Sequence, residues 1–427
     1  MKKVAIKTLG CKVNQYESAC IVNKFEKSGF KVVAFSQNPD IFIINSCTVT
    51  SLASAKSRRI LKKAIEEKRK NPSKKIVITG CYSQLERDKL SKMEEIDIVV
   101  DNTQKNSIYD ILKGNEKNLH STEFAEFKTD NFYGKKRAFI KIQDGCNQFC
   151  SYCIIPFVRN KVSSRAPMEI IKQIKILCKK GFSEFVIGGI NLALYEFCEN
   201  DKKYTLSDVL RGIEKIKSVK AIRLSSLNVE VFNAQFFAYL SQSKKIVPHF
   251  HLSIQSGCEK VLKKMKRRYN PKDIHKVMER IKQIFPNSAI GGDIICGFPV
   301  ESENDFQKSL DFLTNQKFTY FHVFPYSQRE KTVASKLPDQ IPKIVKKIRC
   351  SQIRALSEEK SKDFILQLIK NRVVCSGIVE GEKNGYFYGI SSRYIKFYFK
   401  KDNIKEKENI TFFPKEIFKD GMLVKPI

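Results

Sequence analysis

Three cysteines stand close together in the stretch "KIQDGCNQFCSYCIIPF", residues 141–157. Cys146, Cys150 and Cys153 have the spacing C-x3-C-x2-C, which brings three thiolates within reach of one metal centre. A structural zinc site needs a fourth cysteine or histidine, and the next cysteine, Cys178, is too distant in the sequence. A thioredoxin-like interpretation of "CSYC" leaves Cys146 without a role. Three thiolates on a four-iron cluster leave one iron free for a substrate or cofactor.

A second set of three cysteines is spread over the first part of the chain. Cys11 follows the run "VAIKTLG", Cys47 follows "DIFIINS", and Cys81 follows "KIVITG". Each run reads as a parallel strand, and binding residues of α/β folds gather where such strands end. We therefore expect these thiols to converge on a second metal or cluster site. The alternative is three separate buried thiols.

The elements that position the second set are short apolar runs alternating with amphipathic stretches. The runs are rich in β-branched residues: "VAIKTL", "KVVAFS", "DIFIINS", "KKIVITG" and "IDIVV". Helical patterns cover residues 18–27 and 52–70. This alternation is typical of βαβ units with a mostly parallel sheet. We predict an N-terminal α/β domain over residues 1–115 and a polar linker over residues 116–135.

The alternation resumes with a longer period in the central part of the chain. Candidate strands are "AFIKIQ", "EFVIGGI", "AIRLSSL", "HFHLSIQ", "AIGGDIICGF" and "YFHVFPYS". Such repeats predict an open or closed α/β barrel with functional residues at the carboxyl ends of its strands. Including a helix over residues 346–368, this domain spans residues 136–368. Residues 369–427 carry short alternating strands with Gly and Asn turns, which predict a small all-β barrel.

Composition narrows the class of protein. The 427 residues carry a formal net charge of +33, which indicates a polyanionic partner such as nucleic acid. An A/T-rich codon usage would explain part of the lysine excess. No apolar run approaches the roughly 18–20 residues of a membrane span, and "MKKVAIKTLGCK" reads as a first strand rather than a signal peptide. We expect a cytoplasmic protein whose cysteines serve metal binding or catalysis.

The loop of Cys146, Cys150 and Cys153, with Tyr152 before the last cysteine, resembles that of the radical S-adenosylmethionine (SAM) enzymes. The resemblance implies that these cysteines hold a 4Fe-4S cluster. Its open iron would bind the amino and carboxylate groups of SAM, whose reductive cleavage generates a 5′-deoxyadenosyl radical.

Over nearly its whole length the chain is similar to the methylthiotransferase family. The matching stretches are "TLGCKVNQYES", "NSCTVT", "TGCYSQ", "IQDGCNQFCSYCIIP", "RLSSL", "SIQSGCEKVLKKMKRRY", "DIICGFP" and "HVFPYSQR". The motif "LGCKVNQYES" resembles the branch that methylthiolates N6-threonylcarbamoyladenosine in tRNA, next to the anticodon. The isopentenyladenosine branch reads closer to "YGCQMN", and the branch acting on a ribosomal protein aspartate closer to "LGCPKN".

The resemblance implies insertion of a methylthio group at C2 of the adenine, an unreactive C–H position that calls for radical chemistry. Cys11, Cys47 and Cys81 would hold an auxiliary 4Fe-4S cluster that handles the sulfur, and a second SAM would supply the methyl group. An electron donor of the flavodoxin or ferredoxin type and a sulfur source are implied partners. We expect a monomer.

Contacts to SAM beyond the cluster are predicted at two strand ends. Gly188 and Gly189 in "IGGIN" resemble the superfamily's glycine motif, where the backbone approaches the methionine amino group; tight packing of a strand end is the alternative. Ser253 and Gln255 in "HLSIQS" could bond ribose or carboxylate. Arg165 could pair with a carboxylate or phosphate, or form a surface salt bridge.

The terminal barrel resembles a TRAM domain, a small RNA-binding module. Arg393, Tyr394 and Lys396 in "SSRYIKF" combine cations with an aromatic ring, which suits phosphate contact and base stacking. A place for Tyr394 in the core of the barrel is the alternative.

Some positions depart from the usual pattern of the family. Relatives usually carry glycine where this chain has Asn160, Glu196, Val300 and Lys331, and an acidic residue where it has Asn228. These departures bear more on which substrate the protein accepts than on the reaction that it catalyses. Three other functions remain open: the same reaction on isopentenyladenosine or a ribosomal protein, different chemistry at the second cluster, and non-catalytic RNA binding with structural clusters.

Overall fold

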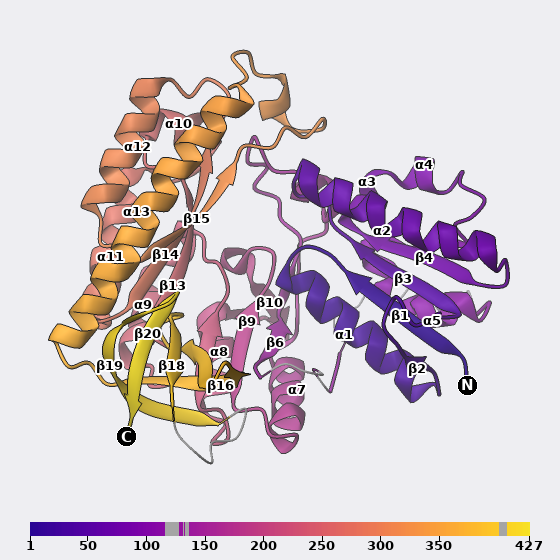
Figure 1. Cartoon of the computed structure of the whole chain (residues 1–427), viewed down its shortest axis with the longest axis horizontal. Helices are drawn as coiled ribbons and strands as arrows, with labels where there is room; N and C mark the ends of the chain where they lie inside the picture. Colours follow the sequence, from indigo (N-terminus) through magenta and orange to yellow (C-terminus); the bar gives the residue numbers. More distant parts are fainter. Residues whose placement is uncertain (116–127, 131, 133–135, 401–407) are drawn as a thin grey trace.

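The structure of the protein is a computed structural model that describes residues 1–115, 128–130, 132, 136–400 and 408–427. The chain forms an N-terminal α/β unit, a central α/β unit and a small C-terminal barrel, which confirms the predicted fold class (Figure 1). The expected linker over residues 116–135 falls largely outside the described residues.

The N-terminal unit is a five-stranded parallel sheet of order β2-β1-β3-β4-β5. Its central strand, "IFIINS", is buried along its whole length, as expected for a parallel sheet covered on both faces. The hydroxyl of Thr50 accepts a hydrogen bond from the backbone N–H of Ala53 and fixes the start of α2. The elements are β1 (Lys3–Thr8), α1 (Lys12–Lys27), β2 (Lys31–Val32), β3 (Ile41–Ser46), α2 (Ser51–Lys70), β4 (Lys75–Gly80), α3 (Cys81–Leu85), α4 (Arg87–Leu90), β5 (Ile98–Val99), η1 (Asn102–Ser107) and α5 (Ile108–Leu112).

The central unit contains all six predicted strands, which form two parallel three-stranded sheets: one of β6, β9 and β12, and one of β13, β14 and β15. The order within the first half is β12-β9-β6, and parallel bridges Ile222–Ile246 and Leu227–Leu252 connect the two halves. The outer strands β6 and β15 are not paired with each other in the described part of the chain, so the barrel is open. The strands are β6 (Ala138–Lys141), β9 (Glu184–Gly188), β12 (Ala221–Leu224), β13 (His249–Gln255), β14 (Ala289–Cys296) and β15 (Tyr320–Pro325).

Amphipathic helices cover the outer side of the open barrel. The unit also contains two short antiparallel strand pairs. Several helices begin at sequence-encoded caps; Asn270, for example, forms a capping box with Asp273. The helical elements are α6 (Ile155–Val158), α7 (Pro167–Lys179), η4 (Leu192–Leu194), α8 (Leu206–Glu214), η5 (Val229–Val231), α9 (Ala234–Gln242), α10 (Glu259–Lys264), α11 (Pro271–Ile284), α12 (Glu303–Asn315), η6 (Val333–Lys336) and α13 (Lys343–Lys370). The antiparallel pairs are β7 (Gln143–Asp144) with β8 (Ser163–Ser164), and β10 (Glu196–Glu199) with β11 (Lys202–Thr205).

The C-terminal unit is a closed five-stranded barrel of order β16-β17-β18-β20-β19. It packs around a core that includes Phe397 and Phe412 and also touches the end of α13. Closure leaves no free sheet edge. The strands are β16 (Cys375–Lys383), β17 (Tyr386–Ser391), β18 (Lys396–Phe399), β19 (Asn409–Phe418) and β20 (Gly421–Pro426).

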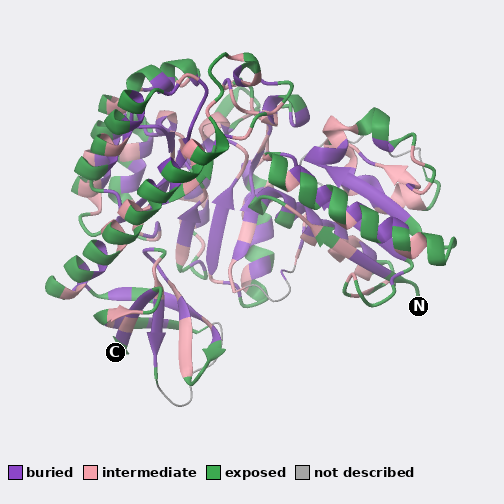
Figure 2. Ribbon diagram, turned by 45° about the horizontal axis from the view of Figure 1, so that its top comes forward, coloured by how far each residue is buried: buried purple, intermediate pink, exposed green. Residues whose placement is uncertain are grey.

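Burial follows this architecture. Figure 2 shows the strands of the two α/β units mostly buried and the outward faces of the helices exposed. None of the helices described is long and apolar enough to cross a membrane.

Candidate active site

The cysteines of the N-terminal unit meet at one edge of the sheet. Strands β1, β3 and β4 run in parallel with Thr8, Asn45 and Thr79 in register, and a cysteine follows each strand within three residues. Burial raises the pKa of the Cys47 thiol to about 11, and the nearby thiols of Cys81 and Cys11 add to the effect. Three cysteines remote in the sequence therefore share one electrostatic environment.

The glycines that precede two of these cysteines make the convergence possible. Gly10 has φ of +90°, and a Cβ there would lie 2.6 Å from the Cys47 sulfur. Gly80 has φ of +102°, and a Cβ there would lie 2.3 Å from the backbone oxygen of Ser46. Any larger residue would be both strained and blocked at these positions. The two glycines allow the strand ends to turn tightly and bring the sulfurs together.

The second set of cysteines lies in the loop between β7 and α6. Burial raises the pKa of Cys153 to about 12, and the thiols of Cys150 and Cys146 contribute through their proximity. Two side chains from other elements reach this loop: the amide of Asn191 lies 3.8 Å from the Cys146 sulfur, and Nη1 of Arg267 lies 3.2 Å from the Cys150 sulfur. These contacts fix the loop against the strand ends of the barrel.

The compactness of a group of ligand atoms distinguishes between kinds of metal centre. A single zinc ion holds its thiolates about 3.8 Å apart, from Zn–S bonds of about 2.3 Å in tetrahedral geometry. Among the described residues, the only candidate ligand atoms that all lie within 4.8 Å of one another belong to His251, Asp293 and His322. Neither cysteine set is among such compact groups of the described residues. Each set supplies three thiolates, which is the donor type that a polynuclear iron–sulfur cluster takes.

One cavity of about 410 Å³ lies between the N-terminal unit, the barrel strands and the terminal barrel. The N-terminal unit contributes Cys11 and Lys12, and the terminal barrel contributes Tyr394. The strand ends of the central unit supply most of the remaining wall: Gly189, Ile190, Asn191, Leu224, Ser225, Ser226, Asn228, His249, His251, Ser253, Tyr320 and His322. The cavity thus brings Cys11 together with Asn191, the residue whose amide contacts the Cys146 sulfur.

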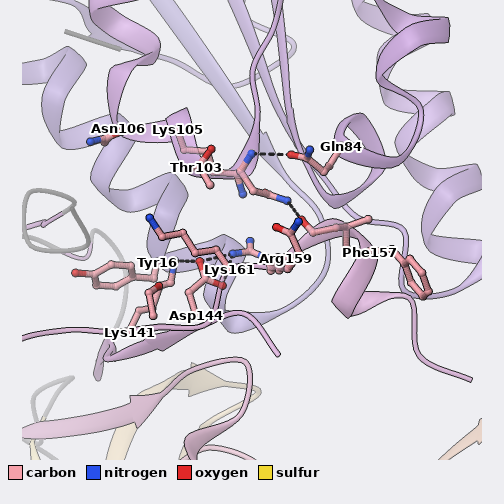
Figure 3. Close-up of a pocket in the computed structure, with 14 residues that line it drawn as sticks. Tyr16, Gln84, Thr103, Lys105, Asn106, Lys141, Asp144, Phe157, Arg159 and Lys161 are labelled. Atoms are coloured by element: carbon pink, nitrogen blue, oxygen red, sulfur yellow. Dashed lines mark hydrogen bonds and ion pairs between the residues drawn. The ribbon is translucent and has the colours of Figure 1, made fainter. Parts of the chain in front are cut away.

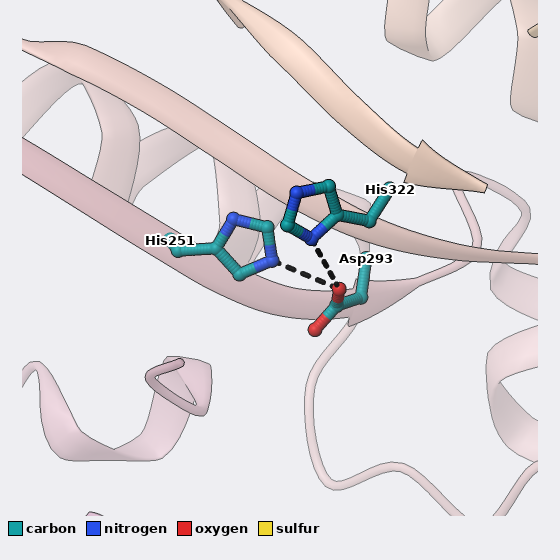
Figure 4. A group of neighbouring side chains, drawn as sticks. All are labelled: His251, Asp293 and His322. Carbon is teal, nitrogen blue, oxygen red and sulfur yellow. Dashed lines mark hydrogen bonds and ion pairs between the residues drawn. The ribbon is translucent and has the colours of Figure 1, made fainter. Parts of the chain in front are cut away.

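A hydrogen-bonded group of polar rings forms one wall of this cavity (Figure 4). A ring nitrogen of His251 lies 2.9 Å from a carboxylate oxygen of Asp293, and a ring nitrogen of His322 lies 3.5 Å from the same atom. The Tyr320 hydroxyl lies 3.0 Å from His251 and 2.8 Å from His249. Burial alone would raise the pKa of Asp293, but the hydrogen bonds from both histidines lower it well below its ordinary value. The group can orient a polar base and exchange a proton with it.

A buried ionic network joins the N-terminal unit to the central unit. Arg159 donates to both carboxylate oxygens of Glu17 at 2.8 Å and to Asp144. Lys141 donates to Glu17 at 2.8 Å, and Lys105 also contacts that carboxylate. Figure 3 shows Asp144, Arg159 and Lys141 in the wall of a neighbouring cavity of about 210 Å³. Arg159 also interacts electrostatically with Cys81, so the network lies beside the auxiliary cysteines.

The residues expected to contact SAM occupy different positions in the structure. A Cβ on Gly188 would meet the ring of Phe139 at 2.6 Å, which gives this glycine a packing role. Gly189 and Ser253 line the cavity, whereas Gln255 is buried just beyond it with φ of +68°. Arg165 is also buried: it donates to the Tyr16 hydroxyl at 3.2 Å and forms no salt bridge with any described residue.

The residues expected to contact RNA are divided between two surfaces. Arg393 is buried and donates to the backbone oxygen of Asn287, so its placement differs from the expected RNA contact. Tyr394 is 42% exposed and stacks on His249 with ring centroids 4.8 Å apart. Lys396 lies on the outside of the barrel beside Asp420. Tyr394 therefore faces the cavity rather than the barrel core.

One departure from the usual family pattern has a visible backbone consequence. Val300 has φ of +65°, a region that glycine adopts freely and a β-branched residue adopts only with strain. The other four positions, Asn160, Glu196, Asn228 and Lys331, have no positive φ. Asn228 accepts a hydrogen bond from Arg267 at 3.2 Å and also lines the cavity.

Several residues at the site have little or no signal in the sequence. Arg267 was hidden in the basic run "KKMKRRY", where nothing distinguishes it from its neighbours. Its guanidinium packs over the ring of Tyr269 at 4.7 Å while donating to Cys150. Asn191 ends the "IGGIN" stretch and could have been included with the glycines. The alternation of His249 and His251 on one strand was the available signal for the ring network.

The chain is similar to known proteins in both sequence and fold. Residues 3–101 match the family described as uncharacterized protein family UPF0004, and residues 140–313 match the radical SAM superfamily. Threonylcarbamoyladenosine tRNA methylthiotransferase MtaB of Aquifex aeolicus is 37% identical, covering 90% of this chain and 97% of that protein. Its counterpart in Bacillus subtilis is 35% identical, covering 94% and 91%. The tRNA-2-methylthio-N(6)-dimethylallyladenosine synthase of Thermodesulfovibrio yellowstonii is 31% identical, covering 84% of each chain.

Solved structures share the fold at low sequence identity. The radical SAM methyltransferase TsrM from Kitasatospora setae superposes with a TM-score of 0.59 at 12% identity, covering 78% of this chain and 77% of that one. The cobalamin-dependent radical SAM enzyme OxsB superposes with a TM-score of 0.55 at 11% identity, covering 78% and 55%. At these identities the likeness concerns the fold alone.

Proposed function

Because the chain belongs to the radical SAM methylthiotransferase family, we propose that it converts N6-threonylcarbamoyladenosine next to the anticodon of tRNA into the 2-methylthio derivative. Relatives named for this substrate reach 37% identity, whereas the relative named for dimethylallyladenosine cited above reaches 31%. The motif around Cys11 favours the same substrate. The protein is accordingly a tRNA (N6-L-threonylcarbamoyladenosine-C2)-methylthiotransferase.

The observation that carries this proposal is the cavity that Cys11 lines together with Asn191, the residue whose amide lies 3.8 Å from the Cys146 sulfur. Cys146, Cys150 and Cys153 would hold one 4Fe-4S cluster, and Cys11, Cys47 and Cys81 would hold the auxiliary one. With SAM bound, the first cluster supplies the radical chemistry that an unactivated C–H bond requires. Cys11 lines the cavity, so a base held there would lie beside the sulfur-handling site.

In this proposal, residues of the chain bind SAM and orient the tRNA base. Gly189 and Ser253 are assigned to SAM, with Gly188 and Gln255 supporting that wall. Arg267 holds a positive charge against the Cys150 sulfur, and the rings of His249, Tyr320 and Tyr394 offer a stacked surface to a planar base. In the terminal barrel, we propose Tyr394 and Lys396 as the residues that contact RNA.

We assign residues 1–115 to the methylthiotransferase domain with the auxiliary cluster, 136–368 to the radical SAM core and 369–427 to a TRAM-like RNA-binding domain. The net charge of +33 supports tRNA binding. The remaining partners would be a flavodoxin-like or ferredoxin-like electron donor and a sulfur source. The enzyme would act as a monomer in the cytoplasm.

The test is mass spectrometry of nucleosides from the tRNA of a strain that lacks this gene, with and without a plasmid-borne copy. We expect loss of the 2-methylthio nucleoside, accumulation of N6-threonylcarbamoyladenosine, and restoration by the plasmid. Loss of the isopentenyl counterpart instead would assign the chain to the other tRNA branch. An unchanged profile would reject a tRNA substrate, and the ribosomal proteins would be analysed next. A non-catalytic RNA-binding protein would never cleave SAM.

A further inference from the structure

The cavity that Cys11 lines is also lined by a lysine, Lys12. Lys12 directly follows Cys11, and its side chain lines both this cavity and an adjoining one of about 510 Å³. Within the described parts of the chain, Lys12 takes part in no hydrogen bond or ion pair. Lys12 is exposed and lines the cavity, so its ammonium group is open to solvent and available to a ligand that enters there.

The other two cations that line the adjoining cavity, Arg223 and Arg137, are already engaged. Arg223 contacts Glu184 and donates to the backbone oxygen of Ser391 at 2.7 Å. Arg137 donates to Glu184 at 2.7 Å and also contacts Glu380. Three cations therefore face two carboxylates, and the unmatched charge is that of Lys12. A cavity of this kind favours an anionic ligand group.

The two tRNA substrates named for the relatives differ in such a group. The threonylcarbamoyl substituent ends in a carboxylate, whereas the dimethylallyl substituent is an uncharged hydrocarbon. An ammonium group forms a strong charge-assisted hydrogen bond with a carboxylate and gains nothing from a hydrocarbon. A lysine at position 12 would therefore distinguish the two substrates by their charge alone.

We propose that Lys12 binds the carboxylate of the N6-threonylcarbamoyl group and thereby selects this base over uncharged N6-alkyl adenosines. The inference rests on the proposed function and names a specificity-determining residue within it. The methionyl carboxylate of SAM is a second source of the same chemistry. The substrate is favoured because Lys12 directly follows Cys11 of the N-terminal unit, whereas Gly189 and Ser253, which we assign to SAM, line the cavity from the central unit.

The experiment measures binding of fluorescent anticodon stem–loops to the purified holoenzyme without SAM. Three stem–loops are compared: one with N6-threonylcarbamoyladenosine, one with an N6-alkylcarbamoyl analogue that keeps the urea but lacks the carboxylate, and one with dimethylallyladenosine. Lys12→Gln is the test variant and Lys12→Arg keeps the charge. Lys7→Gln is the matched control, because Lys7 is an exposed lysine of β1 outside the cavity.

We expect Lys12→Gln to raise the Kd for the carboxylate-bearing stem–loop by about tenfold or more, as for loss of a hydrogen bond to a charged group. The other two stem–loops should change less than about twofold, and Lys12→Arg should retain the preference. Equal weakening of all three would overturn the proposal in favour of a phosphate contact. Weaker binding of SAM by Lys12→Gln, with the stem–loop preference intact, would assign Lys12 to the cofactor and overturn it as well.

This design separates failure of the inference from failure of the proposed function. If the wild-type enzyme forms no methylthio product on the threonylcarbamoyl stem–loop, the proposed function is wrong. If the wild type forms product and discriminates, and Lys12→Gln discriminates equally well, only the role of Lys12 is wrong.

Discussion

Arg159 and Glu17 form a bidentate ion pair in the interior of the protein, with both guanidinium nitrogens 2.8 Å from a carboxylate oxygen. Glu17 belongs to α1 of the N-terminal unit, and Arg159 follows the radical SAM loop of the central unit. Lys105 and Lys141 approach the same carboxylate. This pair therefore holds the two cysteine sets in a fixed relation.

Replacement of Glu17 by Gln should destabilise the protein strongly, because three buried cations would be left with the single carboxylate of Asp144. Breaking a buried ion pair typically costs about 3–5 kcal/mol. Unfolding by guanidinium chloride, followed by circular dichroism, measures the change. Glu259→Gln is the control, since Glu259 pairs with Lys263 on an exposed helix face and should leave stability unchanged. Equal stability of the two variants would show that the buried network does not hold the units together.

The two cysteine sets should have separable functions. Replacing Cys146, Cys150 and Cys153 by Ala should remove about half of the bound iron and abolish formation of 5′-deoxyadenosine, because one of two clusters is lost. Replacing Cys11, Cys47 and Cys81 should leave SAM cleavage intact and end methylthiolation. Iron analysis and liquid chromatography of the products provide the readouts. The exposed Cys198 belongs to neither set, so Cys198→Ala should behave as the wild type.

Arg267 should tune the cluster of the radical SAM loop. Reduction would add negative charge to a cluster held by these cysteines, and the guanidinium 3.2 Å from the Cys150 sulfur would stabilise that charge. Arg267→Gln should shift the midpoint potential to more negative values and slow 5′-deoxyadenosine formation by about 10-fold or more. A redox titration monitored by electron paramagnetic resonance measures the potential. The neighbouring Arg268 is exposed, and Arg268→Gln should leave the potential unchanged; an unchanged potential in Arg267→Gln would refute the assignment.

Glu301 should make stability depend on pH in a direction opposite to most carboxylates. Burial raises its pKa from 4.5 to about 7, against the nearby charge of Arg349. Between these pH values the folded state binds a proton that the unfolded state has lost, so stability falls as pH rises. The contribution lost by pH 8 is about 3 kcal/mol.

The variant Glu301→Gln tests this directly. Its amide oxygen can still accept the hydrogen bond from the backbone N–H of Phe298, but it cannot ionise. The free energy of unfolding of the variant minus that of the wild type should therefore increase between about pH 4.5 and about pH 7 and then level off. A difference that stays constant with pH would contradict the raised pKa.

Much of the architecture was encoded locally and could be predicted from the sequence. The strand runs before Cys11, Cys47 and Cys81, the longer β/α repeat and the Gly- and Asn-rich final segment all appear in the structure as expected. Side-chain periodicity and turn residues act within a few positions of each other, so they can be recognised without knowledge of the tertiary fold. The convergence of the N-terminal cysteines also followed, because parallel strands end at a common edge.

The partners of individual side chains were decided by the tertiary structure. The pairing of Arg159 with Glu17 spans 142 residues, and that of Arg267 with Cys150 spans 117. The sequence around each arginine is unremarkable, and only the packing of separate units brings the charges together. For the same reason Arg393 is buried in the protein interior, whereas its neighbour Tyr394 lines a cavity that is formed largely by the other units. The sequence determined which chemistry the protein carries, and the packing of its three units determined which residues surround the reacting atoms.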